Sequence, residues 1–492
     1  MEFDFPAHFP VWLSVTHFIN LLFITLLIRS GIQILADHPR LYMNRSCAPD
    51  TEWIKFTNKK VPKDKYYTSM DDAVDVSPWI ALPGGFHNLG AGRHWHFFCA
   101  FFWMLNGFTY IFLLFFTEGW RQLIPTSWSF FPNLWQSIVN HATFNVPTVD
   151  YPAYNPLQVF CYFIIVFIVA PLTIATGAAM SPAIAARFPW YPKIFGNRQI
   201  ARSIHFLCMC TYIVFVIVHV FYVCITGFSA NMGHIVLATD DPAYRPLAII
   251  IGAVGIVGII LVHYLSTLWS QKNPRHIQKG IGIVANLFYF LLHGLNSRQK
   301  HSRKSITSYF WINGYPPKDE EWLVHNRTGF KDYKLKIHGL VEKPMELSLA
   351  DLEALPKETQ ITEHNCIQGW SGVGEWGGVS MKTIIELCKP KSNACYAIFH
   401  SYQRDENDIE YYTSLDLKEC QKPQTILAYE MNEKKLVVGH GAPLRLRMET
   451  KLGFKMAKWL RSVEFVEDLK TVGLGHGGYR EDIQFFTKGA EI

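Results

Sequence analysis

The 492-residue sequence lacks several common signatures. Its ten cysteines form no CxxC pair and no regular spacing, which argues against a disulfide framework and an iron–sulfur site. There is no internal repeat, no low-complexity tract and no Rossmann-type glycine fingerprint. The net charge is only +6, and the lysines and arginines lie mostly beside apolar runs. This arrangement is typical of membrane topology, so we expect no nucleic-acid partner.

Two unlike halves are present instead. Residues 1 to about 295 contain long apolar runs, whereas residues 311–492 carry dense charge like a soluble protein. A spanning helix needs about 20 apolar residues, and five segments qualify: about 11–35, 94–117, 158–180, 203–228 and 246–269. No basic n-region or cleavage site precedes the first, so we expect it to be a retained span.

A shorter apolar stretch, Ile281–Leu295, is flanked by Lys279 and Arg298 and predicts a helix on the membrane surface. The basic linker Ser297–Ser305 follows. We therefore divide the chain into an all-α transmembrane bundle (1–275), an interfacial helix with linker (276–308) and a mixed α+β domain (309–492). In that domain we predict strands at Lys334–Val341, Lys435–Val438, Leu444–Met448 and Val463–Val466, and helices at Ser348–Ala354 and Met381–Cys388.

Basic residues beside the spans predict the orientation. With five spans, one side of the membrane receives only Arg121 and Arg245, while the other receives twenty lysines and arginines from 29–93, 181–202 and 271–304. This bias predicts an outside N-terminus and a cytoplasmic soluble domain. The lack of a twin-arginine signal agrees with that prediction.

Histidines inside the predicted spans are costly and typically line an interior site. His205 and His219 lie fourteen residues apart on the fourth span, so both face one side, about 21 Å apart along the axis. That separation suits two haems stacked across the membrane. Opposing ligands are available from His17 in the first span and from His94 or His96 at the start of the second.

Helix direction gives a consistent pairing of these histidines. His17 and His219 meet on the N-terminal side of the membrane, and His96 and His205 meet nearer the soluble domain. The alternative is that each imidazole bonds a backbone carbonyl or fills a helix contact, which we favour for the lone His263.

This half resembles the cytochrome b subunits of formate dehydrogenases, nickel–iron hydrogenases and thiosulfate reductases over roughly residues 8–270. The resemblance rests on the His205/His219 pair, on His17 and on the segment G-R-H-W-H at 92–96. It implies two bis-histidine b haems and electron exchange with quinone, and it selects His96 over His94. The fifth span and the absence of basic residues before the first depart from the family pattern.

In the soluble half a single cysteine stands out. Cys366 lies in T-E-H-N-C-I-Q-G-W-S-G-V-G-E-W-G-G-V, residues 362–379, where glycines and tryptophans indicate a tight loop fitted against a large ligand rather than a regular element. From the residues alone, this cysteine is a nucleophile, a buried thiol or a metal ligand.

This segment, with H-G-A-P-L-R-L-R at 440–447 and K-L-G-F-K-M-A-K-W-L at 451–460, resembles the molybdopterin domain of the sulfite oxidase family. The likeness is nearest to the bacterial branch with the catalytic subunit of protein-methionine-sulfoxide reductase. It covers most of 309–470 and implies that Cys366 is the catalytic thiolate that ligates molybdenum. The implied cofactor-binding residues are Asn313, Ser401, His440, Arg445, Lys455 and Lys458.

One departure bears on the substrate. Sulfite oxidases carry an anion-binding arginine after the cysteine, whereas here Ile367-Gln368-Gly369-Trp370 follows, which puts sulfite in doubt. The substrate contacts are left open to His364, Gln368, Trp370 and Tyr402.

The two resemblances together predict a multi-pass protein of the bacterial inner membrane that holds molybdopterin and two b haems. It would pass electrons between quinone and molybdenum and reduce a small oxo-compound such as a sulfoxide or N-oxide. Membrane lipid is an implied partner, and we allow for a homodimer. The alternatives are oxidation of sulfite with electrons to quinone, and a non-catalytic electron-transfer or redox-sensing module.

Overall fold

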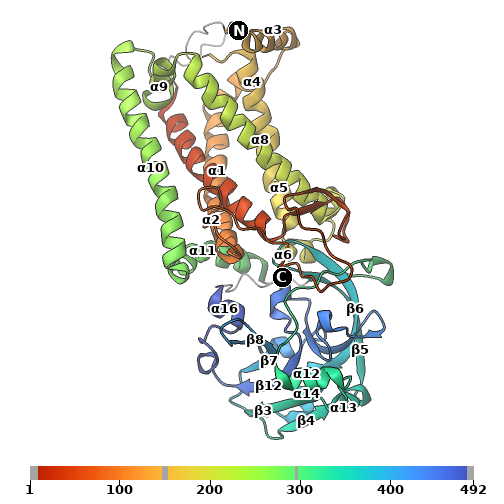
Figure 1. Cartoon of the computed structure of the whole chain (residues 1–492). Coiled ribbons are helices and arrows are strands. Elements are labelled where there is room, and N and C mark those ends of the chain that lie inside the picture. Colours follow the sequence, from red (N-terminus) through yellow and green to blue (C-terminus); the bar gives the residue numbers. More distant parts are fainter. Residues whose placement is uncertain (1–8, 147–152, 294–296, 485–491) are drawn as a thin grey trace.

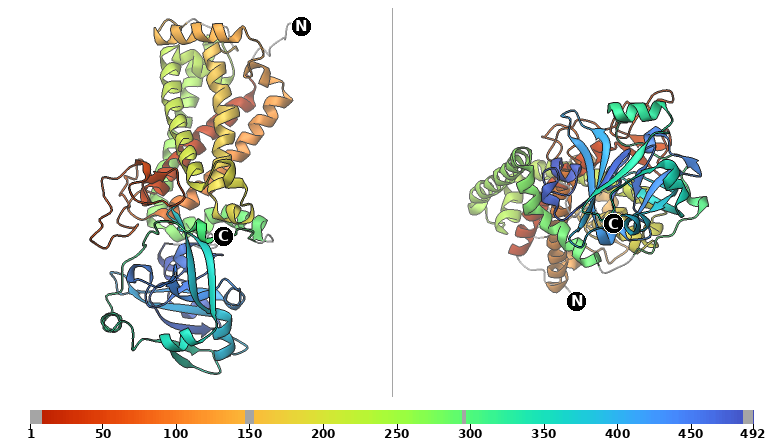
Figure 2. Two further views of the ribbon diagram at one scale, coloured as in Figure 1. Left: turned by 90° about the vertical axis from the view of Figure 1, so that its right-hand side faces the viewer. Right: turned by 90° about the horizontal axis from the view of Figure 1, so that it is seen from below.

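The computed structural model describes residues 9–146, 153–293, 297–484 and 492. A long helical bundle forms one end of the molecule and a sheet-rich domain forms the other (Figure 1). Figure 2 shows that irregular chain from the first half of the sequence lies beside the junction between the two.

The five predicted spans are confirmed as long apolar helices. Each exceeds the ~20 residues that a bilayer requires, and mean hydropathy over the best window of each is 1.8 to 2.5. Their bounds are Val11–Asp37 (α1), Leu89–Phe116 (α2), Pro156–Met180 (α4 and α5), Arg198–Ile225 (α8) and Pro242–Lys272 (mainly α10, Arg245–Lys272). The helices α1 and α2 pack against each other, as do α5 and α8, while α10 lies at the edge of the bundle beside α9 (Phe228–Leu237).

The third span is not a uniform α-helix. Its two α-helical parts, Pro156–Phe163 (α4) and Ala170–Met180 (α5), are joined by a π-helical stretch, Ile164–Val169. Pro171 lies just after this stretch and has no N–H for the carbonyl one turn earlier, a common cause of a local change in helical winding.

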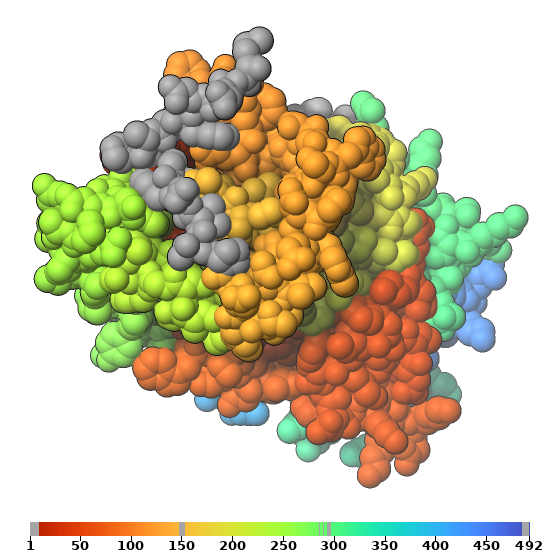
Figure 3. Space-filling view, turned by 90° about the horizontal axis from the view of Figure 1, so that it is seen from above, coloured from red at the N-terminus to blue at the C-terminus, as the bar shows by residue number. Residues whose placement is uncertain are grey.

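Shorter helices cover both ends of the bundle. Phe130–Ala142 (α3) lies at the end far from the soluble domain, and Figure 3 looks onto that end, where orange residues that include α3 cover part of it. At the opposite end lie Pro182–Arg187 (α6), Tyr191–Ile194 (α7) and Pro274–His293 (α11). Residues 281–293 of the predicted interfacial segment lie in α11, and its last two residues, Gly294 and Leu295, lie outside the described residues.

The chain between α1 and α2 forms a connection that packs against the soluble domain. It contains a two-stranded sheet, Arg40–Tyr42 (β1) and Glu52–Lys55 (β2). The buried Arg40 guanidinium pairs with Asp72 at 2.5 Å, which ties the start of the connection to a point further along it. We call residues 38–88 the junction loop.

The soluble domain is built on two five-stranded sheets with strand orders β10-β9-β6-β5, where β11 also pairs with β9, and β4-β3-β12-β7-β8. The strands are Lys334–Gly339 (β3), Met345–Ser348 (β4), Lys357–Asn365 (β5), Ser371–Ser380 (β6), Tyr396–Arg404 (β7), Glu410–Asp416 (β8), Ile426–Met431 (β9), Lys434–Lys435 (β10), Arg445–Arg447 (β11) and Leu460–Val466 (β12). The helices are Glu320–Arg327 (α12), Leu349–Ala354 (α13), Met381–Cys388 (α14), Leu417–Cys420 (α15) and Tyr479–Ile483 (α16).

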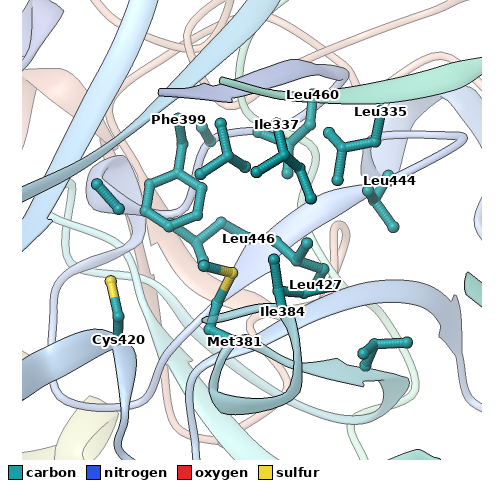
Figure 4. Close-up of a cluster of buried hydrophobic side chains, with 14 of the residues drawn as sticks. Leu335, Ile337, Met381, Ile384, Phe399, Cys420, Leu427, Leu444, Leu446 and Leu460 are labelled. Atoms are coloured by element: carbon teal, nitrogen blue, oxygen red, sulfur yellow. The ribbon is translucent and has the colours of Figure 1, made fainter. Parts of the chain in front are cut away.

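A large apolar core lies between the two sheets. Figure 4 shows Phe399 from β7 facing Met381 of α14, with Leu427 of β9 beside them. These side chains are fully buried, and burying a side chain of this size contributes about 1.5–3 kcal/mol. This core holds the sheet edges, and the loops between them, in fixed positions.

Several predicted elements of the soluble domain are confirmed, and one is wrong. β3, β11, α13 and α14 fall within the predicted segments, and Ser348 caps α13 together with Asp351. β12 contains the predicted strand Val463–Val466 but begins earlier, at Leu460. The predicted strand Lys435–Val438 is wrong beyond its first residue, because β10 ends at Lys435 and Val438–His440 form a 3-10 turn. The chain leaves the sheet there and carries His440 into the pocket described below.

Candidate functional site

Cys366 lies in a five-residue turn between two long strands. The prediction of an irregular loop over residues 362–379 is therefore wrong for its flanks, which belong to β5 and β6. The turn is closed by hydrogen bonds from the Cys366 amide to the Trp370 carbonyl (3.1 Å) and from the Gly369 amide to the Cys366 carbonyl (3.1 Å). Gly369 has a φ of +103°, and a Cβ there would lie 3.3 Å from the Arg202 guanidinium carbon. Glycine is thus needed both for the turn and for close contact with α8.

The Cys366 thiol is buried and has two polar neighbours. Its sulfur lies 3.5 Å from Asn313 Nδ2 and 3.6 Å from Gln368 Oε1. Burial raises the pKa of the Cys366 thiol to about 11, so the free side chain is a neutral thiol. A bound metal ion would favour the thiolate instead.

A pocket of about 930 Å³, counted with its open mouth, surrounds this sulfur. Five of the predicted cofactor or metal residues line it: Asn313, Cys366, His440, Arg445 and Lys458. In the same order, these five residues lie in the segment before α12, in the β5–β6 turn, in the 3-10 turn before β11, in β11 and in the segment just before β12. The tertiary fold brings together residues up to 145 positions apart in sequence.

The pocket contains two buried cations, Arg445 and Lys458. Arg445 Nη1 donates to the His440 carbonyl (2.9 Å), and Arg445 Nε is buried with no hydrogen-bond partner. Lys458 Nζ donates to the carbonyls of Asn313 (2.5 Å) and Gly439 (2.9 Å). Within the described ranges, neither cation makes an ion pair with a carboxylate.

The electrostatics of these groups follow from burial. Burial lowers the pKa of Arg445 to about 9, and burial with the Arg445 charge lowers that of Lys458 well below its usual range. Burial and the two cations lower the pKa of His440 to about 3. An anion placed here would stabilise the charged forms of both cations, so the pocket suits the phosphate of a pterin cofactor.

Two predicted cofactor residues lie behind the pocket wall. Ser401 Oγ donates to the Lys458 carbonyl (2.7 Å) and so positions that residue. Lys455 Nζ is paired with Glu481 Oε1 and donates to the Gly477 carbonyl (3.0 Å). Neither side chain is among those lining the pocket.

The four residues considered as substrate contacts also divide into those that line the pocket and one that does not. His364, Gln368 and Trp370 line the pocket, and the His364 ring stacks on Trp370 with ring centres 5.4 Å apart. Tyr402 does not line it, because its hydroxyl donates to Glu321 (3.2 Å) and its ring belongs to the domain core.

Several pocket residues were not predicted from sequence. Asp37 at the end of α1, with Met70 and His87 of the junction loop, come from the membrane half, and Arg480 comes from α16. No local motif marks these residues. Asp37, Met70 and His87 reach the pocket only when the two halves dock, and Arg480 reaches it through the packing of α16 within the soluble domain. Arg480 supplies an arginine in the pocket although no arginine stands in the segment Ile367–Trp370 directly after Cys366.

Docking of the two halves centres on the Cys366 turn. From the cytochrome half, Arg198 donates to Asn365 Oδ1 (2.6 Å) and Gln199 donates to the Gly369 carbonyl (3.1 Å). On the other side of the turn, Gln368 donates to the Asp37 carbonyl (3.1 Å) and accepts from Ser69 Oγ (2.7 Å). The turn is thus held between the ends of α1 and α8.

The spans bring the four predicted histidines together in two pairs. The ring centres of His17 and His219 lie 6.3 Å apart, and those of His96 and His205 lie 6.2 Å apart. An iron atom bound axially by two imidazoles, each nitrogen about 2 Å away, separates the ring centres by about 6 Å. Both pairs therefore have the spacing that a bis-histidine haem requires.

Hydrogen bonding orients the pair nearer the soluble domain. His96 Nδ1 contacts Ser30 Oγ (3.1 Å), and His205 Nδ1 contacts the Thr173 carbonyl (3.1 Å). Such bonds to Nδ1 fix the ring and leave Nε2 for a metal. His94, by contrast, bonds the Gly90 carbonyl of its own helix (2.8 Å) and faces Gly282 of α11.

The comparisons with known proteins agree with this architecture. Residues 8–237 match the family described as prokaryotic cytochrome b561, and residues 323–471 match the oxidoreductase molybdopterin binding domain. An uncharacterized oxidoreductase of Bacillus subtilis, YuiH, is 31% identical over 32% of this chain and 74% of its own length. The chain belongs to the molybdopterin-binding oxidoreductases. In this member the molybdopterin-binding domain follows a cytochrome b561 domain in the same chain.

Two further relatives have more specific names. A putative protein-methionine-sulfoxide reductase subunit YedZ1 of Azospira oryzae is 34% identical over 36% of this chain and 62% of its own length. The protein-methionine-sulfoxide reductase catalytic subunit MsrP of Campylobacter jejuni is 34% identical over 28% of this chain and 50% of its own length. The oxidoreductase described here thus spans about half to six tenths of the length of these two relatives.

Among solved structures, sulfane dehydrogenase SoxCD of Paracoccus pantotrophus is 22% identical over 31% of this oxidoreductase and 40% of that chain. The TM-score is 0.26, which is too low to support an argument. The family matches establish a multi-pass membrane oxidoreductase with a cytochrome b domain and a molybdopterin-binding domain.

Proposed function

We propose that this oxidoreductase takes electrons from a membrane quinol and uses them to reduce a small oxo-compound, with a sulfoxide as the leading candidate. The observation that carries this proposal is the docking of the Cys366 turn on α8. Arg202 contacts Gly369 of that turn, and His205 lies three residues further along the helix, a rise of about 4.5 Å. A redox group held by His205 would therefore lie close to one held by Cys366.

Two b haems would form the route through the bundle. His17 with His219 would hold the outer haem, and His96 with His205 would hold the inner one. The imidazole spacings of 6.3 Å and 6.2 Å support both assignments. Because His205 and His219 share one helix face, the two irons would be stacked about 21 Å apart along α8.

The pocket residues would hold and orient a molybdopterin. Cys366 would ligate the metal, Arg445 and Lys458 would bind the pterin phosphate, and His440 and Asn313 would line the remainder. When bound, molybdenum supplies two-electron oxygen-atom transfer, while the protein supplies binding, orientation and electrostatics. The buried Nε of Arg445, without a partner in the protein, supports this assignment.

The names of two relatives make methionine sulfoxide the first substrate to test. In the experiment, the haems of the purified protein are reduced with a quinol, and methionine sulfoxide, dimethyl sulfoxide or an N-oxide is added. Reoxidation of the haems by any of these oxides supports the proposal. Reduction of oxidised haems by sulfite would instead establish the opposite reaction, which the position of Arg480 in the pocket favours as the second candidate.

We also propose that the soluble domain lies in the cytoplasm of a bacterial cell, because basic residues gather on its side of the inner membrane. Cys395 provides a direct test, since it is an exposed thiol of the soluble domain. A membrane-impermeant maleimide should label Cys395 only after the cells are broken. Labelling in intact cells, absent in Cys395→Ser, would place the domain outside.

A further inference from the structure

Asp37 brings a carboxyl group from the membrane half into the pocket that contains Cys366. It is the last residue of α1, and only 4% of it is exposed. One carboxylate oxygen, Oδ1, lies 3.3 Å from His87 Nδ1. The other, Oδ2, is buried and has no hydrogen-bond partner. A buried carboxylate oxygen without a partner is costly and points to a function.

His87 connects this carboxyl group with the solvent. The residue precedes α2, and its side chain is 26% exposed while its Nδ1 faces Asp37. An imidazole can take up a proton on one ring nitrogen and release a proton from the other. Asp37 and His87 thus form a continuous pair from the surface to the pocket.

Asp37 differs in chemistry from the other titratable groups of the pocket, which are histidines, cations, a tyrosine and the Cys366 thiol. Asp37 is the only carboxylic acid among the described residues that line it. Burial and neighbouring cations lower the pKa of His364 and His440 far below the usual range, so both rings stay neutral. Two basic side chains, His87 and Arg480, interact with the Asp37 carboxyl group. Gln368 donates to the backbone carbonyl of Asp37.

We propose that Asp37 and His87 form the proton route that serves oxide reduction in this pocket. The inference rests on the proposed function. Reduction of a sulfoxide breaks the S–O bond, places the two electrons that come from the quinol on the substrate, and releases the oxygen as water with two protons. Asp37 would hand these protons to the pocket, and His87 would reload it from solvent.

The test uses conservative variants of the full-length protein. Asp37→Asn keeps the size of the side chain, and His87→Asn keeps a donor near the Nδ1 position and suits the φ of +57° at this residue. Asp75→Asn removes an exposed carboxylate from the same loop and is the control. General acid catalysis contributes about 10²–10⁴-fold, so we expect reoxidation of the quinol-reduced haems by methionine sulfoxide to slow at least about 10²-fold in Asp37→Asn.

The kinetic pattern distinguishes a proton route from a structural role. The slower reoxidation should appear in kcat with KM unchanged, and haem reduction by the quinol should keep its wild-type rate. His87→Gly should be slow as well and should recover with added imidazole. Equal reoxidation rates in wild type, Asp37→Asn and His87→Asn would overturn the proton route and leave the proposed function intact. If no oxide reoxidises the wild-type haems, the proposed function fails and the route fails with it.

An infrared measurement provides a second readout that does not depend on turnover. A difference spectrum between wild type and Asp37→Asn isolates the Asp37 carboxyl band, and transfer into D2O measures its exchange with solvent. We expect the exchange to be slower in His87→Asn and unchanged in Asp75→Asn. Exchange that is equally fast in His87→Asn would show that His87 is not the connection.

Discussion

Replacing His96 with alanine should remove one haem from the protein, whereas replacing its neighbour His94 should remove none. The two histidines are two residues apart on α2 and therefore face different directions. The His96 ring centre lies 6.2 Å from that of His205, while the His94 ring faces Gly282 of α11. Only His96 can therefore share an iron atom with His205.

The structure gives the size of each effect. Without His96 the inner site keeps one axial ligand, so the haem content should fall from about two per protein to about one. His94→Ala loses the hydrogen bond from Nδ1 to the Gly90 carbonyl (2.8 Å), which is worth about 1 kcal/mol. A loss of that size lowers stability slightly but leaves both pairs of ligands in place.

The assay is the pyridine haemochrome absorbance per protein, combined with a redox titration that counts the haem components. In His96→Ala a quinol should still reduce the remaining outer haem, and the oxide should no longer reoxidise it because the inner haem is missing. Loss of a haem in His94→Ala, with both retained in His96→Ala, would refute the assignment. Two haems in both variants would refute the haem site as a whole.

Three further predictions concern the soluble domain. Cys366→Ala should abolish oxide reduction while the haem spectrum stays unchanged, and Cys420→Ala, a buried cysteine away from the pocket, should remain active. Arg445→Gln removes a charged phosphate donor, worth about 1.5–3 kcal/mol, so molybdopterin content measured by metal analysis should fall at least about tenfold. Burial raises the pKa of Glu449 to about 7 from 4.5, so the folded state binds this proton more tightly than the unfolded state. The contribution of Glu449 to the free energy of unfolding is therefore complete below about pH 4.5. It is lost as the pH rises towards 7, a loss of about 3 kcal/mol in all. Thermal unfolding of Glu449→Gln should lack this part of the pH dependence, and identical profiles would contradict the account.

The spans and the histidine pairing followed from sequence because both depend on local rules. Five runs of apolar residues meet the length of a bilayer, and the 3.6-residue period places His205 and His219 on one face of α8. Alternation of helix direction then pairs them with His96 and His17 at matching depths. The ring distances agree with that pairing.

The strands around Cys366 did not follow from sequence. Residues 371–380 contain four glycines and read as a loop, yet they form β6, which is buried along its whole length. A Cβ on Gly378 would lie 2.0 Å from the Leu427 carbonyl oxygen of β9, so glycine is required by close strand packing and not by a turn. Local propensity cannot reveal a requirement that comes from a neighbouring strand.

The sequence by itself determined the membrane bundle, the soluble α+β domain, the four intramembrane histidines and the motif residues Cys366 and Arg445, because each depends on periodicity or on a contiguous motif. Only the tertiary structure decided what closes the pocket. Asp37, His87 and Arg480 enter it from α1, the junction loop and α16, and Lys455 is turned away by its ion pair with Glu481. These positions depend on contacts between segments from 26 to 410 residues apart, and such contacts leave no local pattern in the chain.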